Sequence, residues 1–129
     1  MTLGIATSVR NSKMAQISTA VDSGMTAGKL RIYDGTRPMT GGTVTTLLVE
    51  LDMSDPSFGL PLYGAITAEN ISSGVTIATG VASWFRLVNS EGLFVLDGSV
   101  GSDLILNNNS FTIGVQVDIT SMVLTDADL

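Results

Sequence analysis

The chain has 129 residues, a net charge of −6 and no cysteine or histidine. A chain of this length fits one hydrophobic core, so we expect a single domain over residues 1–129. The lack of cysteine excludes disulfides and thiolate metal sites, and the lack of histidine removes the commonest general base and metal ligand, with any Ser-His-Asp arrangement.

Charged residues make up 14% of the sequence, and the mean hydropathy is +0.40. Soluble proteins average about 25% charged residues, so this composition predicts a surface that partner chains cover. The alternative is a free β-sandwich kept soluble by its many hydroxyl groups. We expect neither a membrane span nor an export signal, because no apolar run has the required length and the start, MTLGIATSVRNSK, lacks a basic flank leading into one.

Basic residues are concentrated near the start of the chain: Arg10, Lys13, Lys29, Arg31 and Arg37. Arg86 is the sixth, and only acids follow it. This polarity favours docking between unlike surfaces. Nucleic acid is not an expected partner, because scattered cations and a pI near 4.2 form no continuous phosphate-binding stripe.

The first predicted element is a short helix over residues 7–23. Val9, Met14, Ile17 and Val21 recur near helical spacing. Thr7 or Ser8 is the expected N-cap, and Gly24 is the expected stop.

From Lys29 the apolar pattern changes to a period of two, which predicts a strand to Tyr33 and then a long turn-rich loop, DGTRPMTGG. Residues 43–51 are β-branched and then apolar, as in a strand that enters the core. The prolines make residues 54–61 a surface connection, and short strands are expected within 62–67.

Residues 75–88 predict a strand with a bulge or bend at Gly80. NSEG at 89–92 is a turn that joins it to 93–100 in a hairpin. A short strand follows at 104–109 and a long one at 111–125, with Val115, Val117 and Ile119 on one face. Many strands and one helix predict a mainly β fold, an antiparallel β-sandwich or jelly-roll-like domain.

No motif in the chain requires catalysis, and we expect no enzyme, no cofactor and no metal site. Asp97 and Asp103 lie in Gly/Ser-rich stretches typical of solvated turns rather than an acid–base pair. The loop 34–42 lacks the Gly-Lys-Ser/Thr ending that binds phosphate. Oxygen-bearing side chains do gather near the C-terminal loops, without the spacing of a calcium loop: Glu91, Asp97, Ser99, Asp103 and Asn107 to Asn109.

Trp84 is the only tryptophan, and we assign it to packing or to an interface, since adjacent aromatics in a strand usually face opposite sides. A different class of function remains open, a carbohydrate-binding module of a tail spike or fibre. In that case Trp84, Tyr33 and Tyr63 would be the sugar platforms. Aromatic residues are only 5% of the chain, which argues against it.

Several segments resemble small head proteins of tailed bacteriophages. They are LRIYDGTRP at 30–38, TLLVEL at 46–51, WFR at 84–86, DGSVG at 97–101, DLILN at 103–107 and the Val-x-Val-x-Ile-x-Ser ending at 115–121. The resemblance is to capsid cement or decoration proteins. It implies a jelly-roll-like fold, no catalytic residues, and binding outside the major capsid lattice.

We therefore expect a non-enzymatic virion structural protein on the capsid exterior, made in the cytoplasm of a bacterial host. Its partners would be the major capsid protein and itself, with a homodimer as the preferred arrangement and a trimer as the alternative. A neck or tail structural role is the other alternative. The candidate partner-contacting residues are Arg10, Lys13, Arg31, Arg37 and Trp84. We expect the four basic residues to meet an acidic capsid surface.

Overall fold

Strand β1 (Lys29–Tyr33) lies at the centre of the largest sheet, between β2 (Leu47–Asp52) and β6 (Trp84–Val88). β7 (Phe94–Ser99) completes this four-stranded antiparallel sheet in the order β2-β1-β6-β7. The computed structural model describes residues 4–126. Leu30 and Ile32 are fully buried on one face, as the period of two predicts for a half-buried strand.

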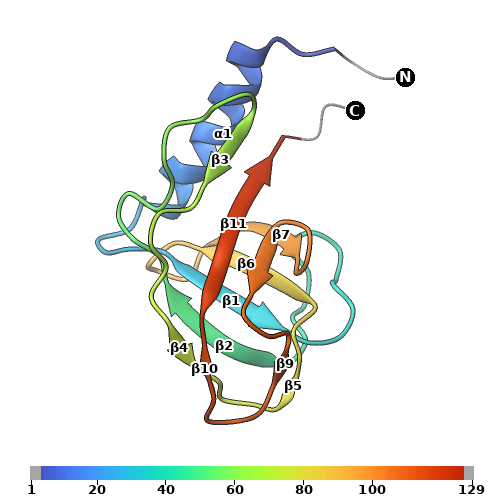
Figure 1. The fold of residues 1–129 in the computed structure, drawn as a ribbon. Helices are drawn as coiled ribbons and strands as arrows, with labels where there is room; N and C mark the ends of the chain where they lie inside the picture. The colour runs from blue at the N-terminus through green and yellow to red at the C-terminus, as the bar shows by residue number, and fades with distance from the viewer. Residues whose placement is uncertain (1–3, 127–129) are drawn as a thin grey trace.

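Smaller antiparallel sheets lie across from this one (Figure 1). β11 (Ile119–Thr125) pairs with β3 (Ala65–Thr67) and β8 (Leu104–Leu106). β4 (Gly74–Val75) pairs with β10 (Gln116–Val117), and β5 (Gly80–Val81) pairs with β9 (Ser110–Phe111). With 38% strand and 12% helix, the chain has the predicted mainly β, antiparallel, β-sandwich-like fold of a single domain.

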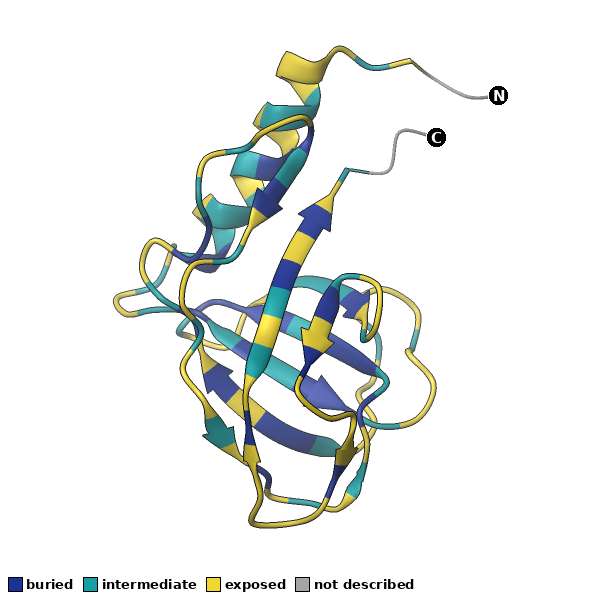
Figure 2. Cartoon of the chain, viewed as in Figure 1, coloured by how far each residue is buried: buried dark blue, intermediate teal, exposed yellow. Residues whose placement is uncertain are grey.

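A continuous core joins the sheets and the helix α1 (Thr7–Val21), as the dark segments of Figure 2 show. Met14 and Val21 attach α1 to it, while Val9 is exposed. The predicted end signals of the helix are wrong. Ala6 is the N-cap and makes no side-chain bond, and Asp22 is the C-cap.

Contacts with distant segments explain the positions of Asp22 and Gly24 at the end of the helix. Asp22 stops the helix where its carboxylate accepts hydrogen bonds from the backbone N–H of Ser57, at 3.1 and 3.2 Å. Gly24 is required for packing instead, since a Cβ there would lie only 1.7 Å from Ser90 Oγ. Segments distant in sequence thus contact both Asp22 and Gly24, while the backbone hydrogen bonds of the turn itself remain local.

Three predicted strands are shorter or divided. Residues 43–46 stay in the loop because Thr46 N–H and Thr45 Oγ donate to Asp34, so β2 begins at Leu47. The segment 75–88 includes the end of β4 and all of β5 and β6, and its bend lies at 77–78, while Gly80 pairs with Phe111. The segment 111–125 divides into β9, β10 and β11, which leaves Val115 exposed.

The predicted hairpin between the strand 75–88 and residues 93–100 is confirmed for the part of the first strand that forms β6, which pairs with β7. Asn89 closes its turn, because its side-chain oxygen accepts the N–H groups of Glu91 and Leu93, each at 3.0 Å. Gly92 has φ 84°, a left-handed conformation that favours glycine. The connection 54–61 contains no named strand, but Ser57 and Phe58 within it are buried.

Candidate interaction surfaces

A row of charged side chains crosses the outer face of the four-stranded sheet. The strand register places Arg31 opposite Glu50 on one side and opposite Arg86 on the other, and Arg86 opposite Asp97. The order along the row is Glu50, Arg31, Arg86, Asp97, so each arginine has a carboxylate as its outer neighbour. Arg31 Nε and Glu50 Oε2 are 2.7 Å apart, and both side chains are about one-third exposed.

Arg86 and Asp97 form the buried half of that row. Arg86 Nε donates to Asp97 Oδ1 at 2.7 Å and its Nη2 donates to Oδ2 at 3.1 Å, a bidentate ion pair. The side chain of Asp97 is 0% exposed. The hydrogen bond to Asp97 raises the pKa of Arg86, against burial, which lowers it. Arg86 therefore stays protonated beside Asp97.

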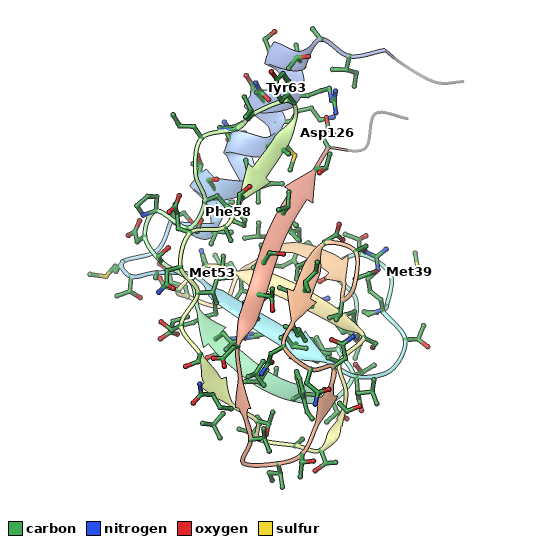
Figure 3. All side chains as sticks on the ribbon, in the orientation of Figure 1. Met39, Met53, Phe58, Tyr63 and Asp126 are labelled. Atoms are coloured by element: carbon green, nitrogen blue, oxygen red, sulfur yellow. The ribbon has the colours of Figure 1, made fainter. Side chains whose placement is uncertain are left out.

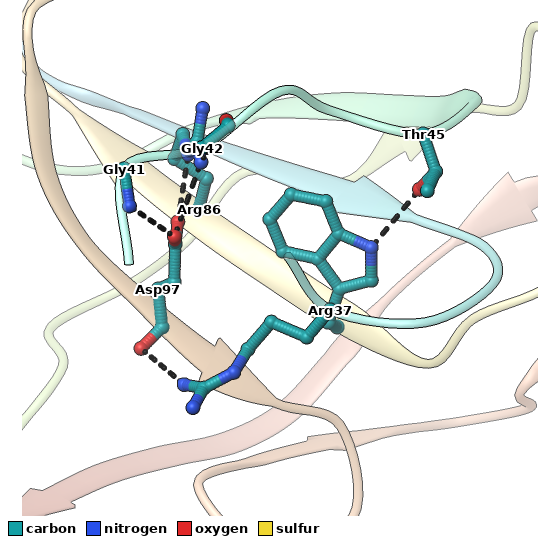
Figure 4. Close-up of polar contacts among 7 residues, drawn as sticks. Arg37, Gly41, Gly42, Thr45, Arg86 and Asp97 are labelled. Atoms are coloured by element: carbon teal, nitrogen blue, oxygen red, sulfur yellow. Dashed lines mark hydrogen bonds and ion pairs between the residues drawn. The ribbon is translucent and has the colours of Figure 1, made fainter. Parts of the chain in front are cut away.

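The loop of residues 34–46 folds over this buried pair and is tied to it through the backbone (Figure 4). Gly41 N–H donates to Asp97 Oδ2 at 3.0 Å, and Arg86 Nη2 donates to the carbonyl of Gly42 at 2.9 Å. At the other end of the loop, Trp84 Nε1 donates to the Asp34 carbonyl and to Thr45 Oγ1. We call residues 34–46 the clamped loop.

Exposed apolar side chains lie on and beside the clamped loop. Met39 is 89% exposed and projects from the molecule at the right of Figure 3. The ring of Phe94 is exposed beside the loop, and a Cβ on Gly41 would lie 3.7 Å from it. The clamped loop thus exposes the Met39 side chain, while hydrogen bonds fix the loop backbone near both ends.

Arg37 is the exception among the basic residues. The other five each form an ion pair with a carboxylate of the described residues, whereas Arg37 forms none. Its Nη1 donates to the backbone carbonyl of Asp97 at 3.3 Å. Arg37 is exposed, and its other hydrogen-bond donors have no partner among the described residues.

The predicted contact residues on the helix have partners within the chain. Lys13 Nζ is 3.1 Å from Asp126 Oδ2, and Arg10 Nε is 3.9 Å from the same oxygen. Arg10 Nη2 also donates to the Asp126 carbonyl. Arg10 and Lys13 thus share one carboxylate where the N-terminal helix meets the end of β11, and Arg37 is the basic member of the predicted set with no carboxylate partner in residues 4–126.

Trp84, the remaining predicted contact residue, is 1% exposed. Its ring stacks on Tyr33 with 4.4 Å between centroids and 15° between planes. Of the two roles predicted for it, packing is the one that the structure shows. Tyr33 is also buried, so among the three proposed sugar platforms only Tyr63 is exposed.

Tyr63 lies at the tip of a tight hairpin beside the helix (Figure 3). Leu62 and Ala65 exchange both backbone hydrogen bonds across the turn, and Tyr63 has φ 51°, in the left-handed region. Leu60, Leu62 and Tyr63 are all largely exposed. An open, mostly apolar groove of about 420 Å³ separates this segment from α1, lined by Ala15, Ser18, Phe58 and Leu60 among others.

The end of the sandwich that contains β4, β5, β9 and β10 has no charged residue in segments 74–81 and 107–117. We call these two segments the uncharged tip. Thr76 fixes its shape from inside, because its buried hydroxyl donates to the Thr112 carbonyl at 2.6 Å and accepts the Val115 N–H at 3.0 Å. Its outward apolar side chains are Val75, Ile77, Val81, Ile113 and Val115.

The C-terminal acidic residues considered as calcium ligands do not form a metal site, and two of them already bind other groups of the chain. Asp97 is paired with Arg86, and Asp103 accepts the N–H of Ser99. Over residues 4–126 no three His, Cys, Asp or Glu side chains gather as a metal site would require. In the same part of the chain, no helix has the length and apolar character needed to cross a membrane.

Comparison with protein-family models, with curated proteins and with solved structures finds no match to this chain.

Proposed function

We propose that this protein is a non-enzymatic structural component of a phage particle, a cement or decoration protein that binds the outside of the capsid lattice and stabilises the head. The proposal rests on the resemblance of its sequence segments to small head proteins, together with the exposed apolar side chains of the fold. Those side chains lie on separate surfaces: the uncharged tip, the hairpin at Tyr63 and the clamped loop.

The separation of these surfaces is the observation that carries the proposal. The uncharged tip is at the opposite end of the molecule from the helix and the hairpin, and Met39 projects from the side (Figures 1 and 3). Exposed apolar patches on soluble proteins mark contact sites. A protein with such patches facing different directions is suited to bridge neighbouring subunits, and repeated weak contacts would add up over a lattice.

The uncharged tip has the features of a lattice contact. Its backbone is fixed by Thr76, so little ordering entropy is lost when a partner binds. Its lack of charge also means that no ion has to be desolvated in the contact. A chain with a net charge of −6 would meet neighbouring copies with least repulsion through such a surface.

Co-sedimentation with expanded, undecorated phage heads tests the proposal, with bare assembly intermediates sedimented in parallel. We expect saturable binding to the expanded heads and greater resistance of the decorated heads to heat or chelator. Absence of binding to any head form would contradict the cement function and direct the search to the neck and tail.

A matched pair of isoleucine variants tests the role of the tip. Ile113→Ser removes an exposed apolar side chain from the uncharged tip, and Ile105→Ser removes one from β8, outside it. We expect Ile113→Ser to weaken binding about tenfold, because it removes an apolar side chain that the contact would bury. Ile105→Ser should leave binding unchanged. Equal effects would mean that the tip is not a contact surface.

A further inference from the structure

We propose that the clamped loop is a preformed docking element whose partner is a protein surface carrying a single carboxylate among apolar side chains. Arg37 would bind the carboxylate, and Met39 would insert beside it. This inference rests on the proposed function, and it names the chemistry of the lattice surface that meets this loop.

Charge complementarity identifies the carboxylate. Arg37 is the only cation among the described residues that is in no ion pair, and it is the only charged residue between Gly35 and Thr46. Its guanidinium has one hydrogen bond, to the carbonyl of Asp97, and so retains donors for a bidentate contact with a carboxylate.

The number of free cations limits how acidic the partner surface can be. The sequence alone predicts a broadly acidic partner surface that meets Arg10, Lys13, Arg31 and Arg37 together. The first three of these have carboxylate partners within the fold, since Arg10 and Lys13 share Asp126 and Arg31 pairs with Glu50. Because the whole chain has a net charge of −6, a broadly acidic surface would repel it, whereas a lone carboxylate opposite Arg37 is attracted.

The apolar part of the partner follows from the neighbours of Arg37. Met39 is two residues away and 89% exposed, and the exposed ring of Phe94 lies beside Gly41. Methionine side chains adapt to irregular apolar surfaces. The hydrogen bonds from Gly41 to Asp97 and from Arg86 to Gly42 hold the backbone after Met39 in place before any partner arrives. The hydrogen bond from Trp84 to the Asp34 carbonyl holds the backbone before Arg37. The loop therefore loses little freedom on binding.

Matched neutralising variants test the inference on the full chain with expanded, undecorated heads. Arg37→Gln and Lys13→Gln each remove one positive charge from an exposed side chain, and Met39→Ala removes the apolar group. We expect Arg37→Gln and Met39→Ala each to weaken binding about tenfold or more. Lys13→Gln should stay within about twofold of the wild type, since its charge is already paired with Asp126.

The outcomes separate this inference from the function on which it rests. If the wild type does not bind heads, the proposed function fails. If the wild type binds and Arg37→Gln and Met39→Ala bind equally well, the docking role of the loop is overturned. Equal losses in Arg37→Gln and Lys13→Gln also overturn it, because they indicate a general effect of net charge. The fluorescence of Trp84, which hydrogen-bonds the loop at Asp34 and Thr45, verifies that each variant is folded.

Discussion

Arg31 and Arg86 lie directly opposite one another on β1 and β6, although like charges in such positions repel. Each is neutralised from its outer side, Arg31 by Glu50 and Arg86 by Asp97. The two halves of the row differ in burial, because the clamped loop covers only Arg86 and Asp97. The ion pair of Arg31 with Glu50 is thus an ordinary surface pair, whereas the ion pair of Arg86 with Asp97 is buried.

Removing one carboxylate from each half of the row is expected to have unequal effects. Asp97→Asn leaves the largely buried guanidinium of Arg86 without a counter-charge, and we expect a loss of about 3–5 kcal/mol in the free energy of unfolding. Glu50→Gln breaks a partly exposed pair, for which about 0–1 kcal/mol is expected. Urea unfolding measures both values, and similar losses would show that the loop does not bury the pair in solution.

Gly98 lies opposite Phe85 in the β6–β7 ladder, and no side chain fits between them. A Cβ at position 98 would be 2.4 Å from the Phe85 ring. We expect Gly98→Ala to destabilise the fold by about 1–3 kcal/mol, as overpacking does, and Phe85→Leu in the same chain to recover part of the loss. Gly4→Ala is the control, since a Cβ there meets nothing within 4 Å. A Gly98→Ala protein as stable as the control would contradict the tight contact.

The two interactions of Trp84 can be separated by substitution. Trp84→Phe keeps an aromatic ring against Tyr33 but removes the hydrogen bonds to Asp34 and Thr45, with an expected cost of about 1 kcal/mol. Trp84→Ala also removes the buried ring, and about 3–5 kcal/mol is expected. Thermal unfolding followed by circular dichroism compares the two. If both variants lose the same stability, the hydrogen bonds to the loop would be the dominant interaction and the stacking unimportant.

One substitution is expected to stabilise the protein. Tyr63 has φ 51° at the tip of its hairpin and is 76% exposed. Asparagine adopts this left-handed conformation more readily, so Tyr63→Asn should raise the free energy of unfolding by about 0.5–1 kcal/mol. Tyr63→Ala removes the same ring without relieving the backbone, and no gain is expected from it. A gain in both variants would assign the effect to the ring and not to φ.

Local patterns predicted the parts of the fold that local forces determine. The alternation at Lys29–Tyr33 and the NSEG turn between β6 and β7 appear where the sequence places them, since a buried face and a tight turn each leave a short-range signal. The helix also lies where its apolar spacing indicates. Its ends were mispredicted because the hydrogen bond from Ser57 to Asp22 and the packing of Gly24 on Ser90 come from distant segments.

The contact surfaces were less predictable than the fold. Arg10, Lys13, Arg31 and Arg37 look equivalent in the sequence, and only the fold shows that the first three have carboxylate partners. Lys13 and Asp126, for example, are 113 positions apart. The uncharged tip could have been found from its sequence, since segments 74–81 and 107–117 contain no charged residue. What the sequence does not show is that these two segments meet, which depends on the pairing of β4 with β10.

The ion pairs from Arg10 and Lys13 to Asp126 bring the first helix and the last strand of the chain to one end of the molecule (Figure 1). A peptide or reporter domain fused before residue 4 or after residue 126 would therefore leave the body of the protein at that end, opposite the uncharged tip. The fold is thus suited to carrying a fused domain at that end, away from the uncharged tip.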